Sequence, residues 1–507
     1  MKRTLYKVIL STAMLAAAAM SSCKKDFTEI NTDPNGTPNA LPSQLLAPAL
    51  VNTLTYNMIR NRNFNNELMQ VTVDMTDAEG ANFRYDIRKN QADYLWNGWY
   101  SQLTNLKDLY ASASRPEVND KSYMGISLIL QSWIFSMLTD TYGDIPYSEA
   151  IKGRSDLNFE PKFDKQKDIY LDIFKQLETA NTLLTAATNV TANSDPVYGG
   201  NVTKWRKFGN SLYLRLLLRL SGKKEVSADM IAKIKEIVDT NAANYPIMAS
   251  NDESAILKWT GTAPYTSPYV GVRVQDFRAI AIADFFIDHL VAWNDPRISI
   301  PLPYGNGTVN RWSIAPISGQ FLGVPSGYAP NNAPAKQSYF YSSDQYPQSL
   351  QVDPMTGMIM NYAELQLILA EAAAKGWISG SAASYYTNGA KSSITQWIPT
   401  WPEDINTFLA NADIQWVESE TIDRKMEKIH LQKYYATFLE DLEQWFEYRR
   451  TGHPVLPKGA GLKNNGVMPA RLNYPIYVQS SNPTNYKTAV SAQGTDDIAT
   501  QVWWQKP

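Results

Sequence analysis

Apolar side chains recur every three or four residues along several long segments of this chain, which is the period of one face of an α-helix. The pattern predicts amphipathic helices at 166–184, 203–220, 360–376 and 430–450. Residues 123–138 carry no charged side chain and are apolar nearly all round, which predicts a helix buried on every side. That segment is too short and too rich in Ser and Gln to cross a membrane. We therefore expect a mainly α fold with a frame of packed helices.

A second region of the chain has a different composition. Residues 245–358 are rich in Pro, Gly, Asn and Tyr and contain only short possible strands. Loops of this length inside a compact fold usually carry function. Residues 451–507 are also irregular. We expect one helical domain over 41–507 that carries a loop-rich insertion at about 245–358.

Bulk composition limits the classes of function. Hydrophobic residues make up 44% of the 507 and charged residues 19%, with a net charge of -2. The chain can therefore bury a large core, and it lacks the basic balance that nucleic-acid binding requires. Tryptophan and tyrosine are abundant, with 14 and 29 residues. Their flat rings suit both a core and the faces of sugar rings, so composition leaves these two uses open.

The N-terminus has the parts of a secretory signal. Lys2, Arg3 and Lys7 precede an apolar run at 8–20, and two serines then lead to Cys23. Cys23 is the only cysteine in the chain, which excludes a disulfide within the chain and a multi-cysteine metal site. A lone cysteine behind such a segment resembles a bacterial lipobox, in which the thiol receives a diacylglycerol. The alternative is an ordinary signal peptide with an incidental cysteine.

We predict the lipoprotein arrangement for this N-terminus. The acyl chains on Cys23, of the palmitate type, anchor such a protein firmly, because each buried CH₂ contributes about 0.8 kcal/mol. The predicted parts are a lipoprotein signal peptide at 1–22 and a lipidated tether and entry segment at 23–40.

Catalytic motifs are absent from the sequence. The three histidines, His289, His430 and His453, lie in no metal-ligand spacing, and neither a Gly-x-Ser-x-Gly elbow nor a phosphate-binding loop occurs. We predict no metal and no cofactor. A glycosidase with two distant carboxylates stays open, because its acids can lie far apart in the sequence. Three acids that line the 430–450 helix are read as a solvated charged face, with support from a Glu447–Arg450 pair: Glu440, Glu443 and Glu447.

Several motifs in chain order resemble the SusD/RagB family of nutrient-binding outer-membrane lipoproteins, and within it the SusD-like group. The most specific is Asp-Thr-Tyr-Gly-Asp-Ile-Pro-Tyr-Ser-Glu-Ala at 140–150. The others are Phe-Thr-Glu-Ile-Asn-Thr-Asp-Pro-Asn at 27–35, Trp96 with Tyr100, Leu103 and Asn105, Tyr-Ala-Glu at 362–364 with Ala-Glu-Ala at 370–372, Trp-Phe-Glu-Tyr-Arg-Arg-Thr-Gly-His-Pro at 445–454, Arg-Leu-Asn-Tyr-Pro at 471–475 and Val-Trp-Trp at 502–504. Together they span nearly the whole chain.

The resemblance implies a fold, a partner and a place in the cell. The implied fold is an α superhelix of four tetratricopeptide-like helix pairs with a loop-rich capping region. The implied partner is a SusC-like TonB-dependent transporter, over which the lipoprotein acts as a hinged lid. The charged residues at 24–26 resemble the surface-export signal of Bacteroidetes lipoproteins, which implies a protein anchored at the outer membrane and exposed at the cell surface. The implied ligand is an oligosaccharide, although some members resemble peptide binders.

The motif residues themselves are expected to be structural. We expect Gly143, Pro146 and Gly452 to shape turns. The aromatic members Tyr142, Tyr147 and Trp445 are expected to pack, and Arg449 and Arg450 to pair with acids.

No motif transfers a ligand site, because the cargo varies within the family. We therefore predict contacts from loop aromatics and polar partners. The predicted ligand-binding residues are Asp77, Arg84, Trp96, Trp312, Tyr328 and Tyr339. The leading hypothesis is a binding protein without catalytic activity. The alternatives are a surface-anchored glycoside hydrolase, a peptide-binding lipoprotein and a protein scaffold.

Overall fold

The computed structural model describes residues 40–76, 78–302 and 309–506. The chain divides into two compact units, Met1–Leu41 and Pro42–Pro507, and the description below concerns the second. Cys23 and the predicted signal and tether lie outside the described residues, as does Asp77. In the described part, no helix combines the length and the apolar character that a bilayer crossing requires.

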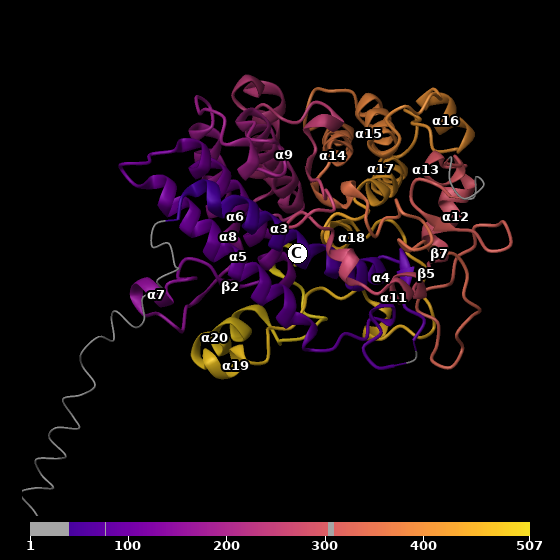
Figure 1. Ribbon diagram of the computed structural model, residues 1–507, viewed down its shortest axis with the longest axis horizontal. Coiled ribbons are helices and arrows are strands. Elements are labelled where there is room, and N and C mark those ends of the chain that lie inside the picture. The colour runs from indigo at the N-terminus through magenta and orange to yellow at the C-terminus, as the bar shows by residue number, and fades with distance from the viewer. Residues whose placement is uncertain (1–39, 77, 303–308, 507) are drawn as a thin grey trace, which may run out of the picture. The chain divides into compact units, whose positions relative to one another are not determined.

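Long helices form the frame, as the apolar periodicity predicted. They pack as consecutive pairs, α3 with α5, α6 with α8, α9 with α10 and α14 with α15. Figure 1 shows α14 beside α15. This confirms the predicted mainly α fold with tetratricopeptide-like pairs. Their bounds are α3 Pro42–Arg60, α5 Gln91–Ser114, α6 Lys121–Tyr142, α8 Gln166–Leu183, α9 Val202–Leu220, α10 Ser227–Lys235, α14 Tyr362–Ala374, α15 Ala382–Trp397, α16 Ile405–Asn411, α17 Ile422–Ala436 and α18 Glu443–Thr451.

Local sequence sets the ends of these helices. The Asp120 side chain accepts hydrogen bonds from the backbone N–H groups of Ser122 and Tyr123, which caps the start of α6. Asn361 caps α14 in the same way through the N–H of Glu364. Gly376 follows α14 with a φ of 73°, a left-handed conformation that glycine adopts without strain.

The predicted single helix at 430–450 is wrong. α17 ends at Ala436 and α18 begins at Glu443, and Leu439 between them has a φ of 70°. Tertiary contacts hold this break, since Asn61 donates to the carbonyl of Asp441 at 2.8 Å and Trp133 donates to its carboxylate at 3.2 Å. Apolar residues keep their helical spacing across the break because the segments before and after it both face the core.

Short elements fill the loop-rich region and the C-terminal part. Four strands form a sheet in the order β1-β5-β7-β6 with antiparallel pairs, in which Ala281 of β5 lies opposite Tyr339 of β7. Two further pairs are β2 with β3 and β4 with β8. The strands are β1 Thr72–Val73, β2 Ile145–Pro146, β3 Phe163–Asp164, β4 Ala255–Leu257, β5 Ala281–Ile282, β6 Ile314–Ala315, β7 Tyr339–Phe340 and β8 Gly357–Met360. The short helices are α4 Asn66–Leu68, α7 Gly153–Asp156, α11 Val274–Ala279, α12 Asp284–Ala292, α13 Pro296–Ser299, α19 Val478–Ser481 and α20 Pro483–Gln493.

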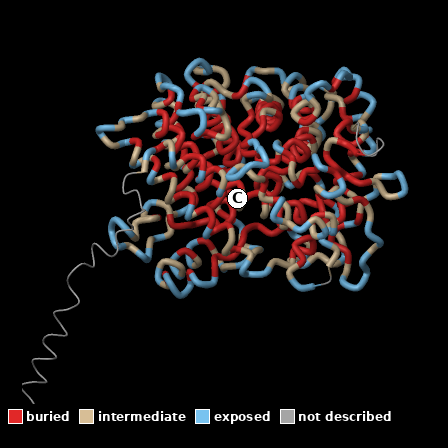
Figure 2. The backbone as a smooth tube through the Cα atoms, in the orientation of Figure 1, coloured by how far each residue is buried: buried red, intermediate tan, exposed pale blue. Residues whose placement is uncertain are grey.

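Buried residues run through the interior of the second unit (Figure 2), and many of them are aromatic or aliphatic. Trp99, Trp133 and Trp205 are fully buried on α5, α6 and α9. Most of the aromatic surplus therefore serves the core.

Candidate ligand-binding surfaces

The predicted ligand-binding residues differ in how far each side chain is buried. Trp312 has no exposed surface and packs among Phe286, Phe438 and the guanidinium of Arg297. A ring enclosed in this way cannot contact a solute in this conformation, so Trp312 is left out of the candidate site. The polar sequence around Trp312 gave no sign that Phe286 and Phe438 would enclose its ring.

Arg84 and Tyr328 come together, but as a packing pair. Arg84 lies 4.7 Å from the ring centroids of both Phe83 and Tyr328, and its Nε donates to the Tyr328 carbonyl at 2.8 Å. Arg84 is 3% exposed and Tyr328 8%. This pair attaches the loop at 328 to the segment after β1 and presents little surface to a ligand.

Tyr339 and Trp96 each reach a surface. Tyr339 is half-buried on β7, with Tyr341 at 6.1 Å and the ammonium of Lys336 at 4.7 Å from its ring. Trp96 is 6% exposed on α5, but it lines a pocket of about 200 Å³. The two residues belong to separate surfaces.

We call the second surface the aromatic pocket. It lies between α5, the segment around β2 and β3, and α19. Trp96 forms its base and contacts the rings of Tyr100 at 5.0 Å and Phe163 at 6.3 Å. The lining consists of aromatic, aliphatic and small polar side chains: Trp96, Tyr100, Pro146, Ala150, Ile151, Phe159, Pro161, Phe163, Tyr477, Val478, Ser481 and Asn482.

Two residues of this pocket were missed from the sequence. Phe159 is 73% exposed and Tyr477 is 44% exposed. Over the ranges 40–76, 78–302 and 309–506, they are the two aromatic side chains in the exposed class, and both line the aromatic pocket. Phe159 lies in a polar, proline-containing loop, Asn-Phe-Glu-Pro. Phe159 is thus a loop aromatic of the same kind as Tyr328 and Tyr339, and its loop setting was the signal that could have identified it.

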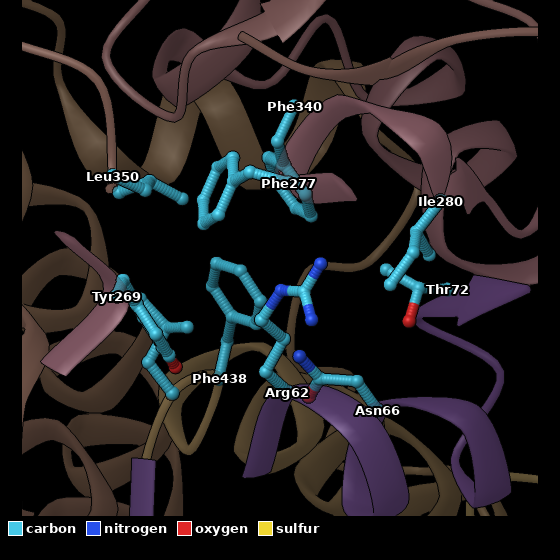
Figure 3. Close-up of a pocket in the computed structure, with 10 residues that line it drawn as sticks. Arg62, Asn66, Thr72, Tyr269, Phe277, Ile280, Phe340, Leu350 and Phe438 are labelled. Carbon is cyan, nitrogen blue, oxygen red and sulfur yellow. The ribbon is translucent and has the colours of Figure 1, made fainter. Parts of the chain in front are cut away.

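A small pocket lies between α4, α11 and β7 (Figure 3). The rings of Phe277, Phe340 and Phe438 and the side chain of Arg62 converge on it. Its volume is about 30 Å³, which holds one or two waters and no sugar ring. The buried hydroxyl of Tyr269 on its wall lacks a hydrogen-bond partner among the described residues, which suits a bound water.

The acids at 440–447 were predicted to be a solvated charged face, and this is wrong. Glu440, Glu443 and Glu447 are 0%, 3% and 6% exposed. Glu440 pairs with Arg215 and Glu443 with Arg219, both on α9. Burial raises the pKa of Glu440 well above its usual range and that of Glu443 to about 7. These carboxylates join the two halves of the helical frame, and no substrate reaches them in this conformation.

One group of side chains has the composition of a metal site. Possible ligand atoms of Glu371, His430 and Glu447 lie within 4.8 Å of one another. Cations already neutralise the carboxylates, because Arg450 pairs with both of them and Lys433 lies 3.3 Å from Glu447. A buried carboxylate that is paired in this way is a poor ligand for a further cation, so we assign the cluster a structural role.

The two arginines of the 445–454 motif behave differently. The predicted Glu447–Arg450 pair is confirmed, and Arg450 also reaches Glu371. Arg449 was predicted to pair with an acid, but it donates to the backbone carbonyls of Asp140 and Ala470 and lies over the ring of Trp445. Acceptors so far away in the sequence could not be foreseen.

Comparisons with known proteins agree with this fold. A solved chitin-binding protein is 26% identical, with 92% of this chain and 99% of that chain covered and a TM-score of 0.74. A SusD homologue from Bacteroides fragilis is 27% identical over 92% of this chain and 99% of that chain, with a TM-score of 0.75. A chitin-binding SusD homologue from Flavobacterium johnsoniae shares the fold at 22% identity, with 92% and 98% covered and a TM-score of 0.76. No curated protein matches the chain.

A family model settles the relationship. The SusD-like model, described as starch-binding and associating with the outer membrane, matches residues 34–475. That match covers most of the 507 residues, and it agrees with the motif resemblance. The chain belongs to the SusD-like family.

Proposed function

We propose that this protein is a lipoprotein of the outer-membrane surface that captures an oligosaccharide and passes it, unchanged, to a SusC-like TonB-dependent transporter. Family membership and the solved chitin-binding relatives support the carbohydrate class. The signal-like segment and Cys23 support the lipid anchor. Peptide capture is the alternative ligand class that the sequence left open.

The observation that carries the proposal is the place of the exposed aromatic side chains. Folding buries aromatic rings because each removes a large apolar area from water. Phe159 and Tyr477 are left exposed, and they lie around one pocket with Trp96 at its base. Exposed rings gathered at one hollow indicate a binding site.

The chemistry of the aromatic pocket suits a sugar. Pyranose rings have apolar faces that stack on aromatic rings, and hydroxyl groups that need polar partners at the edge. Tyr477, whose hydroxyl donates to Asn97 at 2.5 Å, is held at the rim, and Ser481 and Asn482 supply polar atoms beside it. Individual contacts of this kind are weak, so we expect dissociation constants in the micromolar to millimolar range.

The same surface also has features of a protein interface. Leu157, two residues before Phe159, is 75% exposed, and Ile476, directly before Tyr477, is 53% exposed. A patch of this type can dock a partner protein as well as a sugar. The second candidate role is therefore contact with the transporter, in which these side chains become buried against the barrel.

The acids that the sequence placed along 440–447 do not suit a glycosidase. A glycosidase needs two carboxylates about 5–10 Å apart across an accessible cleft. Glu440 and Glu443, two of the carboxylates whose pKa burial raises, are buried and paired with arginine, so they do not face such a cleft. The proposal is therefore capture without turnover.

Calorimetric titration of the chain from residue 24 onward, against a panel of oligosaccharides and peptides, tests the proposal. Product analysis of the same samples follows each titration. Saturable binding of a glycan that is recovered intact is the expected result. Cleavage of the glycan would overturn capture without turnover, and binding of peptides alone would replace the carbohydrate class. If no oligosaccharide or peptide binds but the protein binds the transporter, the result would favour the docking role for the exposed aromatic side chains.

A further inference from the structure

A second and larger hollow lies on the helical frame, on the far side of the segment 146–150 from the aromatic pocket. We call it the helix pocket. Its volume is about 450 Å³, within the range of about 300–1,000 Å³ that small-molecule sites occupy. Residues of α5, α6 and α8 line it, together with Tyr147 and Ser148 from the segment after β2. Neither the motifs nor the family comparison assigns it a role.

The polar side chains of the helix pocket are held in place. Asp172 on α8 accepts hydrogen bonds from the hydroxyl of Tyr147 at 2.7 Å and from Nε2 of Gln176 at 3.3 Å. Lys107 on α5 donates to the carbonyl of Ala150 at 3.1 Å. An ammonium has three donors and a carboxylate has about four acceptor positions, so both groups keep capacity for a ligand.

One buried polar atom in the helix pocket points to a ligand independently. Ser132 on α6 lines the pocket and is 2% exposed. Its Oγ has no hydrogen-bond partner among the described residues. Buried hydroxyls are nearly always paired, so an unpaired one on the wall of a hollow calls for a partner from outside the chain.

The character of the walls defines the class of ligand. One cation, Lys107, and one anion, Asp172, leave no net charge among the lining side chains, which does not favour a charged ligand. The amides of Gln131 and Gln176 add donors and acceptors, and Tyr110, Phe135 and Tyr147 add aromatic surface. A neutral polyhydroxylated ring matches this mixture of aromatic faces and fixed polar groups.

The two pockets share a wall. Pro146 and Ala150 line the aromatic pocket, while Tyr147 and Ser148 line the helix pocket. Tyr100 donates to the carbonyl of Pro146 at 2.7 Å and Lys107 to that of Ala150, so both ends of the wall are attached to α5. Tyr100 and Lys107 are seven residues apart, or about 10 Å along the helix axis.

We propose that the helix pocket is a second sugar site, which binds another part of the same glycan that occupies the aromatic pocket. The inference rests on the proposed capture of oligosaccharides. Two linked sites raise affinity without strong single contacts, because the second binding event becomes intramolecular. A glycan that fills both pockets is selected for its length as well as its composition.

The variant Asp172→Asn tests the helix pocket, because it removes the charge while Tyr147 can still donate to the amide oxygen. The matched control is Asp168→Asn, the same change on an exposed residue of α8 that does not line the pocket. We expect Asp172→Asn to weaken the binding of a neutral tetrasaccharide about tenfold, with Asp168→Asn like the unaltered protein. Thermal unfolding of both variants checks that the fold is retained.

Crystals soaked with tetrasaccharides of N-acetylglucosamine, glucose and xylose give the direct readout. Density for a sugar in both pockets, together with the loss in Asp172→Asn, is the expected result. Density in the aromatic pocket alone would overturn the second site and leave oligosaccharide capture standing. Density in the helix pocket with unchanged affinity in Asp172→Asn would mark binding at crystal concentration only and would also overturn it. Density in neither pocket would overturn both proposals.

Discussion

Arg215 on α9 and Glu364 on α14 form a two-point ion pair inside the protein, with Nε–Oε1 at 2.8 Å and Nη2–Oε2 at 2.5 Å. Arg215 is 3% exposed in its side chain and Glu364 is 0% exposed. Arg215 also pairs with Glu440, whose other oxygen accepts from Asn361. The helices of the N-terminal half are thereby joined to those of the C-terminal half.

Arg215→Met should therefore destabilise the fold strongly. The variant leaves Glu364 and Glu440 buried without their cation, and removal of one partner of a buried pair costs about 3–5 kcal/mol. Urea unfolding at neutral pH measures the change in the free energy of unfolding. Arg273→Met is the control, because Arg273 is 80% exposed in its pair with Asp276 and its loss should change stability by less than about 1 kcal/mol. Equal effects of the two variants would contradict the structural role of the buried pair.

His430 should make the fold sensitive to acid. Burial lowers the pKa of this imidazole from its ordinary 6.5 to about 4. Between those values the unfolded chain binds a proton that the folded protein does not, so the contribution of His430 to stability falls as the pH falls through that window. The shift corresponds to roughly 3 kcal/mol. Urea unfolding of the protein and of His430→Gln, at several pH values between about 7 and 4, should show their stability difference changing with pH.

The comparison with His430→Gln is needed because Glu443 changes the stability of the fold with pH in the opposite direction. The pKa of Glu443 is raised by burial to about 7, so its contribution is present below about 4.5 and is lost as the pH rises toward 7. That contribution is common to both proteins and cancels in the difference. A stability difference that stays constant over the whole range would refute the assignment to His430.

Two glycines of the family motifs should differ in their tolerance of a methyl group. Gly143 has a φ of 84°, and a Cβ there would lie 1.8 Å from Oε1 of Gln493. Gln493 cannot easily move, because it bonds the backbone of both Tyr142 and Asp144. Gly452 has a φ of 73°, but nothing lies within 4 Å of its Cβ position.

Gly452→Ala should therefore cost only the backbone strain, about 1–2 kcal/mol. Gly143→Ala should cost clearly more, since it adds a steric clash and disturbs two hydrogen bonds. Thermal unfolding of the two variants side by side measures this. An equal loss of stability in the two variants would show that the Gln493 side chain moves aside without a cost in free energy.

Phe159→Ala and Tyr477→Ala should each weaken glycan binding about tenfold, equivalent to about 1.4 kcal/mol. Phe159 is 73% exposed, so Phe159→Ala should change the free energy of unfolding by no more than about 0.5 kcal/mol. Tyr477→Ala also removes the hydrogen bond to Asn97 and should cost about 0.5–1.5 kcal/mol. Leu171→Ala on α8 is the control, an exposed apolar side chain outside the aromatic pocket. Unchanged affinity in both aromatic variants, with loss of transporter binding instead, would assign the exposed rings to docking.

Trp96→Ala should lose stability as well as binding. The indole contacts the rings of Tyr100, Tyr142 and Tyr474. Its removal leaves a cavity in a packed aromatic cluster, at a cost of about 3–5 kcal/mol. Chemical denaturation and titration of the same preparation separate the two effects. A stable Trp96→Ala variant would mean that the ring serves the ligand more than the core.

Cys23→Ser should release the protein from the membrane. The thiol is the proposed attachment point of the lipid, and a serine hydroxyl does not replace it. Fractionation of cells, with palmitate labelling, measures the change, and the unaltered chain is the control. Retention of label and membrane association in Cys23→Ser would show that the cysteine is incidental.

The sequence by itself determined the helical frame, because an apolar stripe of helical period has to be covered and pairs of such helices cover each other. It also determined the family, since motifs such as the segment 140–150 fix turns through Gly143 and Pro146 whatever the cargo. Helix ends at Asp120, Asn361 and Gly376 followed from local hydrogen bonds and φ preferences.

The tertiary structure alone decided which aromatic rings and acids are accessible. Trp312 and Phe159 both lie in polar, irregular sequence, yet one is fully buried and the other is 73% exposed. Glu440 has the spacing of a surface residue. It lies in the core because the chain breaks between α17 and α18 and because Arg215 on α9 pairs with it there. Burial depends on which distant segments cover a residue. No local pattern carries that information, and for this reason the candidate pockets became visible only in the folded chain.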